Sequence, residues 1–151
     1  MDVGLRIVSV RRDPQVSERL RTGKFRVNQE LNQEWVDLHN QGQYVLNLQG
    51  RILACVLREG LKHAPRRFQI LKQVPIQSQE TIPMNPGQRF RLYTGERSGQ
   101  NLQLNPQDRI QRVLWLVHSS YLWLPRGNEA HLYFSQADLK QANPLVRFYL
   151  D

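Results

Sequence analysis

The 151-residue sequence predicts an all-β fold, an antiparallel sandwich or barrel that forms a single domain over residues 1–151. Three observations lead to this prediction. Many short segments alternate apolar and polar residues, and turn signals separate them. The segment 51–57 (RILACVL) is apolar on both faces after its first residue, as expected for a central strand covered on both sides. The chain shows no repeat, low-complexity tract or domain boundary.

The clearest alternation lies in the segment 34–40 (EWVDLHN). Because successive side chains of a strand point to opposite faces, Val36 and Leu38 share one face while Trp35, Asp37 and His39 share the other. We expect the first pair to be buried and the other three residues to be more exposed. The same reading predicts further strands at 4–10, 44–48, 51–57, 68–74, 89–94, 113–117, 121–124, 130–134 and 145–150.

The connections add short helical turns to this plan. Asn105-Pro106 has the form of an N-cap followed by proline at the first helical position, so a short helix through about residue 112 is expected. Other helical turns are expected near 16–20 and 136–140. Gly42 lies in a polar corner where a positive φ would suit glycine. Phe68, Ile70 and Lys72 are expected on one face of an edge strand that charge protects.

The chain is strongly basic, with a formal net charge of +8 and an isoelectric point near 10.2. Arginine greatly outnumbers lysine, and its planar guanidinium suits phosphate and carboxylate partners. Two interpretations stay open. The charge serves solubility alone, or it serves a functional anionic partner.

Several classes of protein are disfavoured. No apolar run approaches the roughly 20 residues of a membrane-spanning helix, so no membrane insertion is expected. The N-terminal residues carry their arginines after a short apolar run, opposite to a secretory signal, and a cytoplasmic location is expected. The single cysteine, Cys55, excludes an intramolecular disulfide and a cysteine-rich zinc site, and it is expected to be a small buried apolar residue.

No catalytic centre is expected. Of the four histidines, only His39 has an acid close by with the same facing, Asp37, and a third metal ligand is not identifiable. Cys55 has no adjacent positive group that would activate it as a nucleophile. A glycine-rich phosphate loop is also missing from the sequence. We therefore expect no metal, no cofactor and no enzymatic activity.

Two groups of residues are candidates for binding nucleic acid or another anion. The first is the basic connection 58–67, with Arg58, Lys62, Arg66 and Arg67. The second is an open face that would form if three strands shared a sheet, because cations and aromatic rings would then interleave and could hold phosphates and stacked bases. Its residues would be Arg89, Arg91, Tyr93, Tyr133, Arg147 and Tyr149, with His131 between them. Ordinary cross-strand pairing on a solvated face explains the same pattern.

Three short motifs, in order, resemble the lamin tail domain family. The first is the segment 32–53, whose matching residues are Asn32, Glu34, Trp35, Val36, Asp37, Leu38, Asn40, Gly42, Leu46, Leu48, Gly50 and Leu53. The others are the corner 84–88 (MNPGQ) and the tail motif formed by Trp123-Leu124, Gly127-Asn128-Glu129 and Leu132-Tyr133. The resemblance implies an immunoglobulin-like β-sandwich without a shared catalytic centre, in a family whose members are generally interaction modules.

The chain departs from the family pattern at two positions. Arg51 stands where a tryptophan usually follows the second corner in the family pattern, so a core aromatic must come from elsewhere, and Trp115 and Trp123 are candidates. Asn128 replaces an aspartate after Gly127. Our first hypothesis is a non-enzymatic interaction module, with a protein as its partner. The second is a DNA- or RNA-binding protein that uses the Arg/Tyr face and the connection 58–67. An undetected hydrolase is the third class, and no residues identify it.

Overall fold

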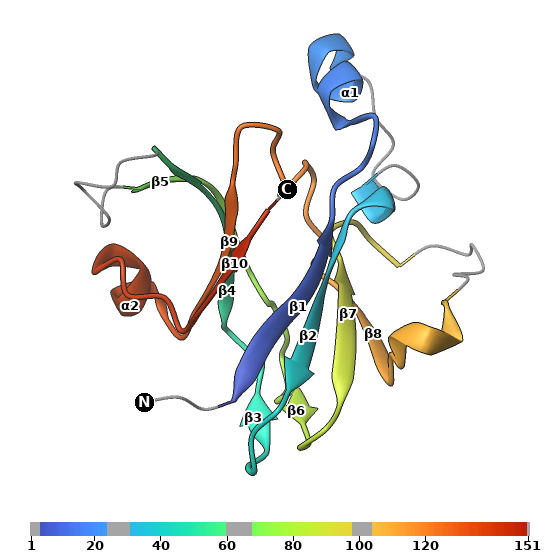
Figure 1. Cartoon of the computed structure of the whole chain (residues 1–151), viewed down its shortest axis with the longest axis vertical. Coiled ribbons are helices and arrows are strands. Elements are labelled where there is room, and N and C mark those ends of the chain that lie inside the picture. Colours follow the sequence, from blue (N-terminus) through green and yellow to red (C-terminus); the bar gives the residue numbers. More distant parts are fainter. Residues whose placement is uncertain (1–3, 24–30, 60–67, 98–103, 151) are drawn as a thin grey trace.

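The chain folds into two four-stranded β-sheets that pack face to face (Figure 1). The structure is a computed structural model that describes residues 4–23, 31–59, 68–97 and 104–150. Sheet 1 has the order β1 (Leu5–Arg11), β2 (Trp35–Asn40), β7 (Arg89–Tyr93) and β8 (Arg112–Trp115). Sheet 2 has the order β10 (Val146–Tyr149), β9 (Glu129–Tyr133), β4 (Ile52–Arg58) and β5 (Phe68–Pro75). A third ladder joins β3 (Leu46–Asn47) to β6 (Pro83–Met84).

This architecture confirms the predicted all-β sandwich and the central position of β4, while its immunoglobulin-like character stays a prediction. One pair departs from the antiparallel plan: β7 and β8 run parallel, with Leu92 opposite Leu114. Parallel neighbours need a long crossover connection. The residues between β7 and β8 supply it, and they include the 3-10 turn η2 (Pro106–Asp108).

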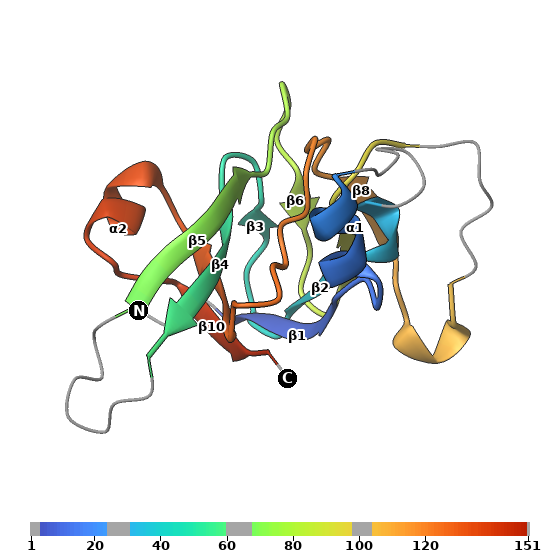
Figure 2. The same cartoon turned by 90° about the horizontal axis from the view of Figure 1, so that it is seen from above.

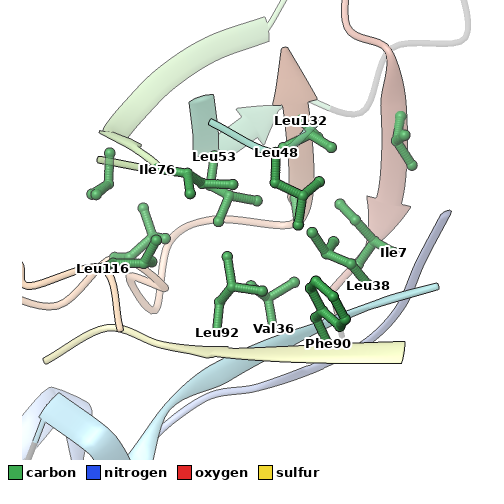
Figure 3. Packing of buried hydrophobic residues seen from close by; sticks show 14 of the residues in the cluster. Ile7, Val36, Leu38, Leu48, Leu53, Ile76, Phe90, Leu92, Leu116 and Leu132 are labelled. Carbon is green, nitrogen blue, oxygen red and sulfur yellow. The ribbon is translucent and has the colours of Figure 1, made fainter. Parts of the chain in front are cut away.

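The core lies between the two sheets and takes side chains from both (Figure 3). Val36 and Leu38 on β2 are fully buried there, as predicted, and Trp123 supplies the fully buried core tryptophan. Trp115 lies on the outer face of sheet 1 instead. Cys55 is also buried in this core, as expected. Core residues that Figure 3 labels include Ile7, Leu48, Leu53, Ile76, Phe90, Leu92, Leu116 and Leu132.

Helices cover the sandwich only locally. The helices α1 (Val16–Thr22) and α2 (Gln136–Lys140) lie far apart on the molecule (Figures 1 and 2). The single turn η1 (Leu31–Gln33) precedes β2. Asn105 caps η2 as predicted, and its side chain accepts a hydrogen bond from the backbone N–H of Gln107 at 3.0 Å. The turn ends at Asp108, however, and not near residue 112.

The segment 32–42 places buried polar side chains where they bind neighbouring loops. Asn40 donates hydrogen bonds to the carbonyls of Met84 and Tyr44 at 2.9 and 2.8 Å, and accepts one from Gly42. Gly42 does not have a positive φ, contrary to our prediction. Gly4 does have a positive φ, and it packs tightly against this corner, because a Cβ on Gly4 would lie 2.4 Å from the Cα of Gly42.

Several predicted boundaries were wrong. The segment 121–124 is buried coil and not a strand, β3 covers only two residues of 44–48, and β6 was not predicted. A bulge between Cys55 and Val56 places Lys72 opposite Cys55, so Lys72 does not share the face of Phe68 and Ile70. The edge position of β5 was predicted correctly.

Candidate functional site

The structure divides the predicted Arg/Tyr face between the two sheets. β7 belongs to sheet 1, whereas β9 and β10 belong to sheet 2. Because the inner faces of both sheets form the core, their outer faces point in opposite directions. The single open face predicted from the sequence is therefore wrong, and each half must be considered by itself.

On the outer face of sheet 1, one residue from each strand forms a continuous row. Arg11, Trp35, Tyr93 and Trp115 are successive cross-strand partners from β1 to β8. The Trp35 and Tyr93 rings meet edge to face with centroids 5.6 Å apart, and the Tyr93 and Trp115 rings stack at 6.4 Å. Such geometries are favourable for aromatic pairs. The row thus fixes three large rings across the sheet.

Arginine side chains lie over the indole rings of this row. The guanidinium carbon of Arg91 is 4.2 Å and that of Arg11 is 4.9 Å from the ring centroid of Trp35. Arg97 lies 5.8 Å from the centroid of Trp115. These distances fall within the range of cation–π attraction. We call this surface the arginine–aromatic face; it comprises Arg11, Trp35, Arg91, Tyr93, Arg97 and Trp115.

Arg91 was predicted to be an exposed ligand-binding cation, and the structure shows otherwise. Its side chain is buried, and it pairs with Asp37 at 2.7 Å and with Asp108 at 3.0 Å. Burial alone would lower the pKa of Arg91, but the hydrogen bonds with Asp37 raise it overall. Asp37 is also buried and not more exposed as expected. Both charges are thus paired with opposite charges inside the fold.

The other predicted residues of sheet 1 differ in their access to solvent. Tyr93 is buried, with only 3% of its surface exposed, because the two indoles cover it. Arg89 is half-buried at the start of β7, opposite His39. Burial and the nearby charge of Arg89 lower the pKa of His39.

The free charge of the arginine–aromatic face comes from Arg11 and Arg97. Both side chains are exposed. In the part of the chain that the structure describes, no carboxylate lies within ion-pair distance of either guanidinium. Neither arginine was among the predicted site residues. Trp35 was predicted to point outward, but its neighbours could be recognised only from the strand pairing.

On the outer face of sheet 2, a buried chain of polar groups replaces the predicted open surface. Arg58 binds the carboxylate of Glu129. Glu129 also contacts Nε2 of His131 at 3.0 Å, and the hydroxyl of Tyr133 lies 2.8 Å from Nδ1 of the same ring. Burial lowers the pKa of His131 in spite of Glu129, so the ring is neutral at pH 7. Tyr133 is thus fully buried and was wrongly predicted to be exposed.

The remaining predicted residues have separate locations. Arg147 and Tyr149 are exposed on β10, as the alternation predicted. Arg58 is the last residue of β4 and not part of a solvated loop. Lys62, Arg66 and Arg67 lie outside the described residues.

No protein-family model and no curated protein matches this chain. Among the described residues, no three His, Cys, Asp or Glu side chains are grouped so that they could hold a metal ion. The helices of the same ranges are too short or too polar to cross a membrane. The geometry of the two outer faces therefore carries the functional argument.

Proposed function

We propose that this chain is a non-catalytic interaction module that binds an acidic protein surface through the arginine–aromatic face. The observation that carries this proposal is the row of Arg11, Trp35, Tyr93 and Trp115 across all four strands of sheet 1. The lamin-tail resemblance of the sequence supports a binding function, since that family is made up largely of interaction modules.

The composition of the face favours a protein partner. Tryptophan, tyrosine and arginine are the residues most enriched among the energetic centres of protein interfaces. Arg11 and Arg97 already rest over indole rings, so binding would cost less side-chain entropy than it would for free arginines. Their uncompensated charges, together with the net charge of +8, favour an acidic surface.

Nucleic acid is the second candidate, because the same exposed cations could neutralise phosphates. Non-specific binding of single strands, however, relies on aromatic rings that are open to stack bases. On this face Tyr93 is buried, and guanidiniums lie over Trp35 and Trp115. The geometry therefore favours an acidic protein over a single-stranded nucleic acid.

Fluorescence anisotropy can compare the two classes directly. The probes are a fluorescein-labelled 12-residue peptide rich in glutamate and aspartate with one central phenylalanine, and a labelled 15-nucleotide oligothymidine. We expect Arg11→Gln/Arg97→Gln to weaken peptide binding at least fivefold. The matched control, Lys140→Gln/Arg147→Gln, removes the same charge from exposed residues of α2 and of β10 in sheet 2, and it should change the affinity less than twofold.

Tryptophan fluorescence locates the bound peptide. The chain has three tryptophans, and Trp123 is fully buried in the core, so a change on binding reports on Trp35 or Trp115. Equal losses of peptide affinity in the two double variants would show that net charge alone determines binding, and this would overturn the proposal. Tighter binding of the oligonucleotide, with a log–log salt slope of several units, would establish the second candidate instead.

A further inference from the structure

A pocket of about 640 Å³ lies on the outer face of sheet 2, away from the arginine–aromatic face. It is bounded by the end of β4, the start of β5, the segment that follows α2, and β10, elements that lie together on one side of the sandwich (Figure 1). Its volume is within the range of small-molecule sites. The described residues that line it are Arg58, Phe68, Gln141, Ala142, Asn143, Pro144 and Arg147.

Arg58 is held rigidly at one side of this pocket. Its guanidinium binds the carboxylate of Glu129 and lies 5.2 Å from the ring centroid of Phe68. Glu129 is fixed in turn by His131, at 3.0 Å from Nε2. Because 18% of the Arg58 side chain is still exposed, the remaining N–H groups can reach a ligand without reorganising the side chain.

Arg147 brings the charge that is not already neutralised. It lies on β10 opposite His131, and its side chain is exposed. Within the described ranges, no carboxylate approaches it within ion-pair distance, and none of the lining residues is acidic. Gln141 and Asn143 add side-chain amide donors to the wall. The pocket therefore has an excess of hydrogen-bond donors and of positive charge.

We infer that this pocket binds a small molecule that carries a phosphate monoester. Such a group has a charge near −2 and three strong acceptor oxygens, which match two guanidiniums and neighbouring amide donors. Phe68 is only partly buried, and its ring offers an apolar contact for the organic part of the ligand. The inference does not depend on the proposed function, because the two surfaces lie on opposite sheets.

The test is a titration followed by ¹H–¹⁵N correlation spectra of the full chain. Three probes distinguish the contribution of the phosphate group from that of the aromatic ring: phenyl phosphate, inorganic phosphate and benzoate. We expect saturable shifts confined to residues that line the pocket, with phenyl phosphate binding at least fivefold more tightly than benzoate. Phe68→Leu should reduce the advantage of phenyl phosphate over inorganic phosphate, because it removes the ring contact.

Arg147→Gln is the decisive variant, since an exposed residue can be changed without loss of the fold. This variant should weaken the binding of phenyl phosphate at least fivefold. Lys140→Gln, at an exposed position of α2 that does not line the pocket, removes the same charge and should stay within twofold of the wild type. Equal effects of the two variants would overturn the inference, as would tighter binding of benzoate, shifts on sheet 1, or no saturation at 20 mM of each probe.

Discussion

Asp37 on β2 and Arg91 on β7 are direct cross-strand partners that form a buried two-point ion pair. The carboxylate accepts hydrogen bonds from Nε and Nη2 of Arg91 at 2.7 and 2.8 Å. It accepts a further one, at 2.8 Å, from the hydroxyl of Ser9 on β1. The pair thus connects three strands of sheet 1 beneath the arginine–aromatic face, and it holds Arg91 against Trp35.

Loss of this carboxylate should be costly. In Asp37→Ala the buried Arg91 loses its two-point partner and keeps Asp108 as its one carboxylate contact among the described residues. Breaking a buried pair typically costs about 3–5 kcal/mol. We expect a decrease of that order in the free energy of unfolding measured with urea. The partner variant Asp108→Asn removes a carboxylate whose side chain is 41% exposed, so it should cost only about 1 kcal/mol or less. Similar losses in both would contradict the importance of the Asp37 contact.

Glu34 gives the fold a pH dependence of unusual sign. Its carboxylate is fully buried, and it accepts hydrogen bonds from the Thr94 hydroxyl at 2.6 Å and from the backbone N–H of Leu122 at 2.8 Å. Burial raises the pKa of Glu34 from 4.5 to about 7, although these donors oppose the shift. The folded chain therefore binds a proton more tightly than the unfolded chain between pH 4.5 and 7, so this residue lowers stability as the pH rises.

A shift of this size corresponds to about 3 kcal/mol across the window. His131 acts in the opposite direction, because its pKa is lowered by burial and its contribution is lost as the pH falls below 6.5. The free energy of unfolding must therefore be compared between the wild type and a Glu34 variant at each pH. We expect Glu34→Gln to gain stability relative to the wild type as the pH rises from 5 to 8, in urea unfolding at fixed temperature. A difference that does not change with pH would show that Glu34 is ionised throughout.

The sequence predicts the strands well where one rule decides the outcome. Alternation is enough to orient Val36, Leu38, Phe90 and Leu92 toward the core, because one face of each strand must be buried. The exposed state of Arg147 and Tyr149 follows from the same rule. The apolar run of β4 correctly indicates a central strand.

The site could not be predicted in the same way, because it depends on which strands are neighbours. Alternation places Arg91 and Tyr133 on the outer faces of their sheets. It does not show that Trp35 and Asp37 cover Arg91, or that α2 covers Tyr133. The strand order and the parallel β7–β8 pair are long-range properties. The row from Arg11 to Trp115 exists only once that order is known.

Gly127 and Cys55 are coupled by close packing. A Cβ added to Gly127 would lie 2.1 Å from Sγ of Cys55, which is buried in the core. Gly127→Ala should therefore destabilise the fold by about 1–3 kcal/mol, as overpacking does. Cys55→Ala removes the clashing sulfur, so the double variant should be more stable than Gly127→Ala alone. A double-mutant cycle by urea unfolding measures this coupling; simple additivity would contradict the packing argument.

Val117 has a backbone conformation that a β-branched residue rarely adopts. Its φ is 54°, in the left-handed region, while its side chain is 60% exposed and its N–H donates to the carbonyl of Gly95 at 3.1 Å. An L-residue in that region costs about 1–2 kcal/mol, and few side-chain contacts oppose a change at so exposed a position. Glycine tolerates this φ but loses more backbone entropy on folding. We therefore expect Val117→Gly to raise the free energy of unfolding by about 0.5–1 kcal/mol.

Val45→Gly is the matched control for this change. Val45 is exposed to a similar degree, at 58%, but its φ is not positive. There glycine relieves no strain and adds only unfolded-state entropy, so stability should fall by about 0.5–1 kcal/mol. Thermal and urea unfolding of both variants should therefore move in opposite directions. A loss of stability in both would mean that contacts of the Val117 side chain outweigh the strain of its backbone.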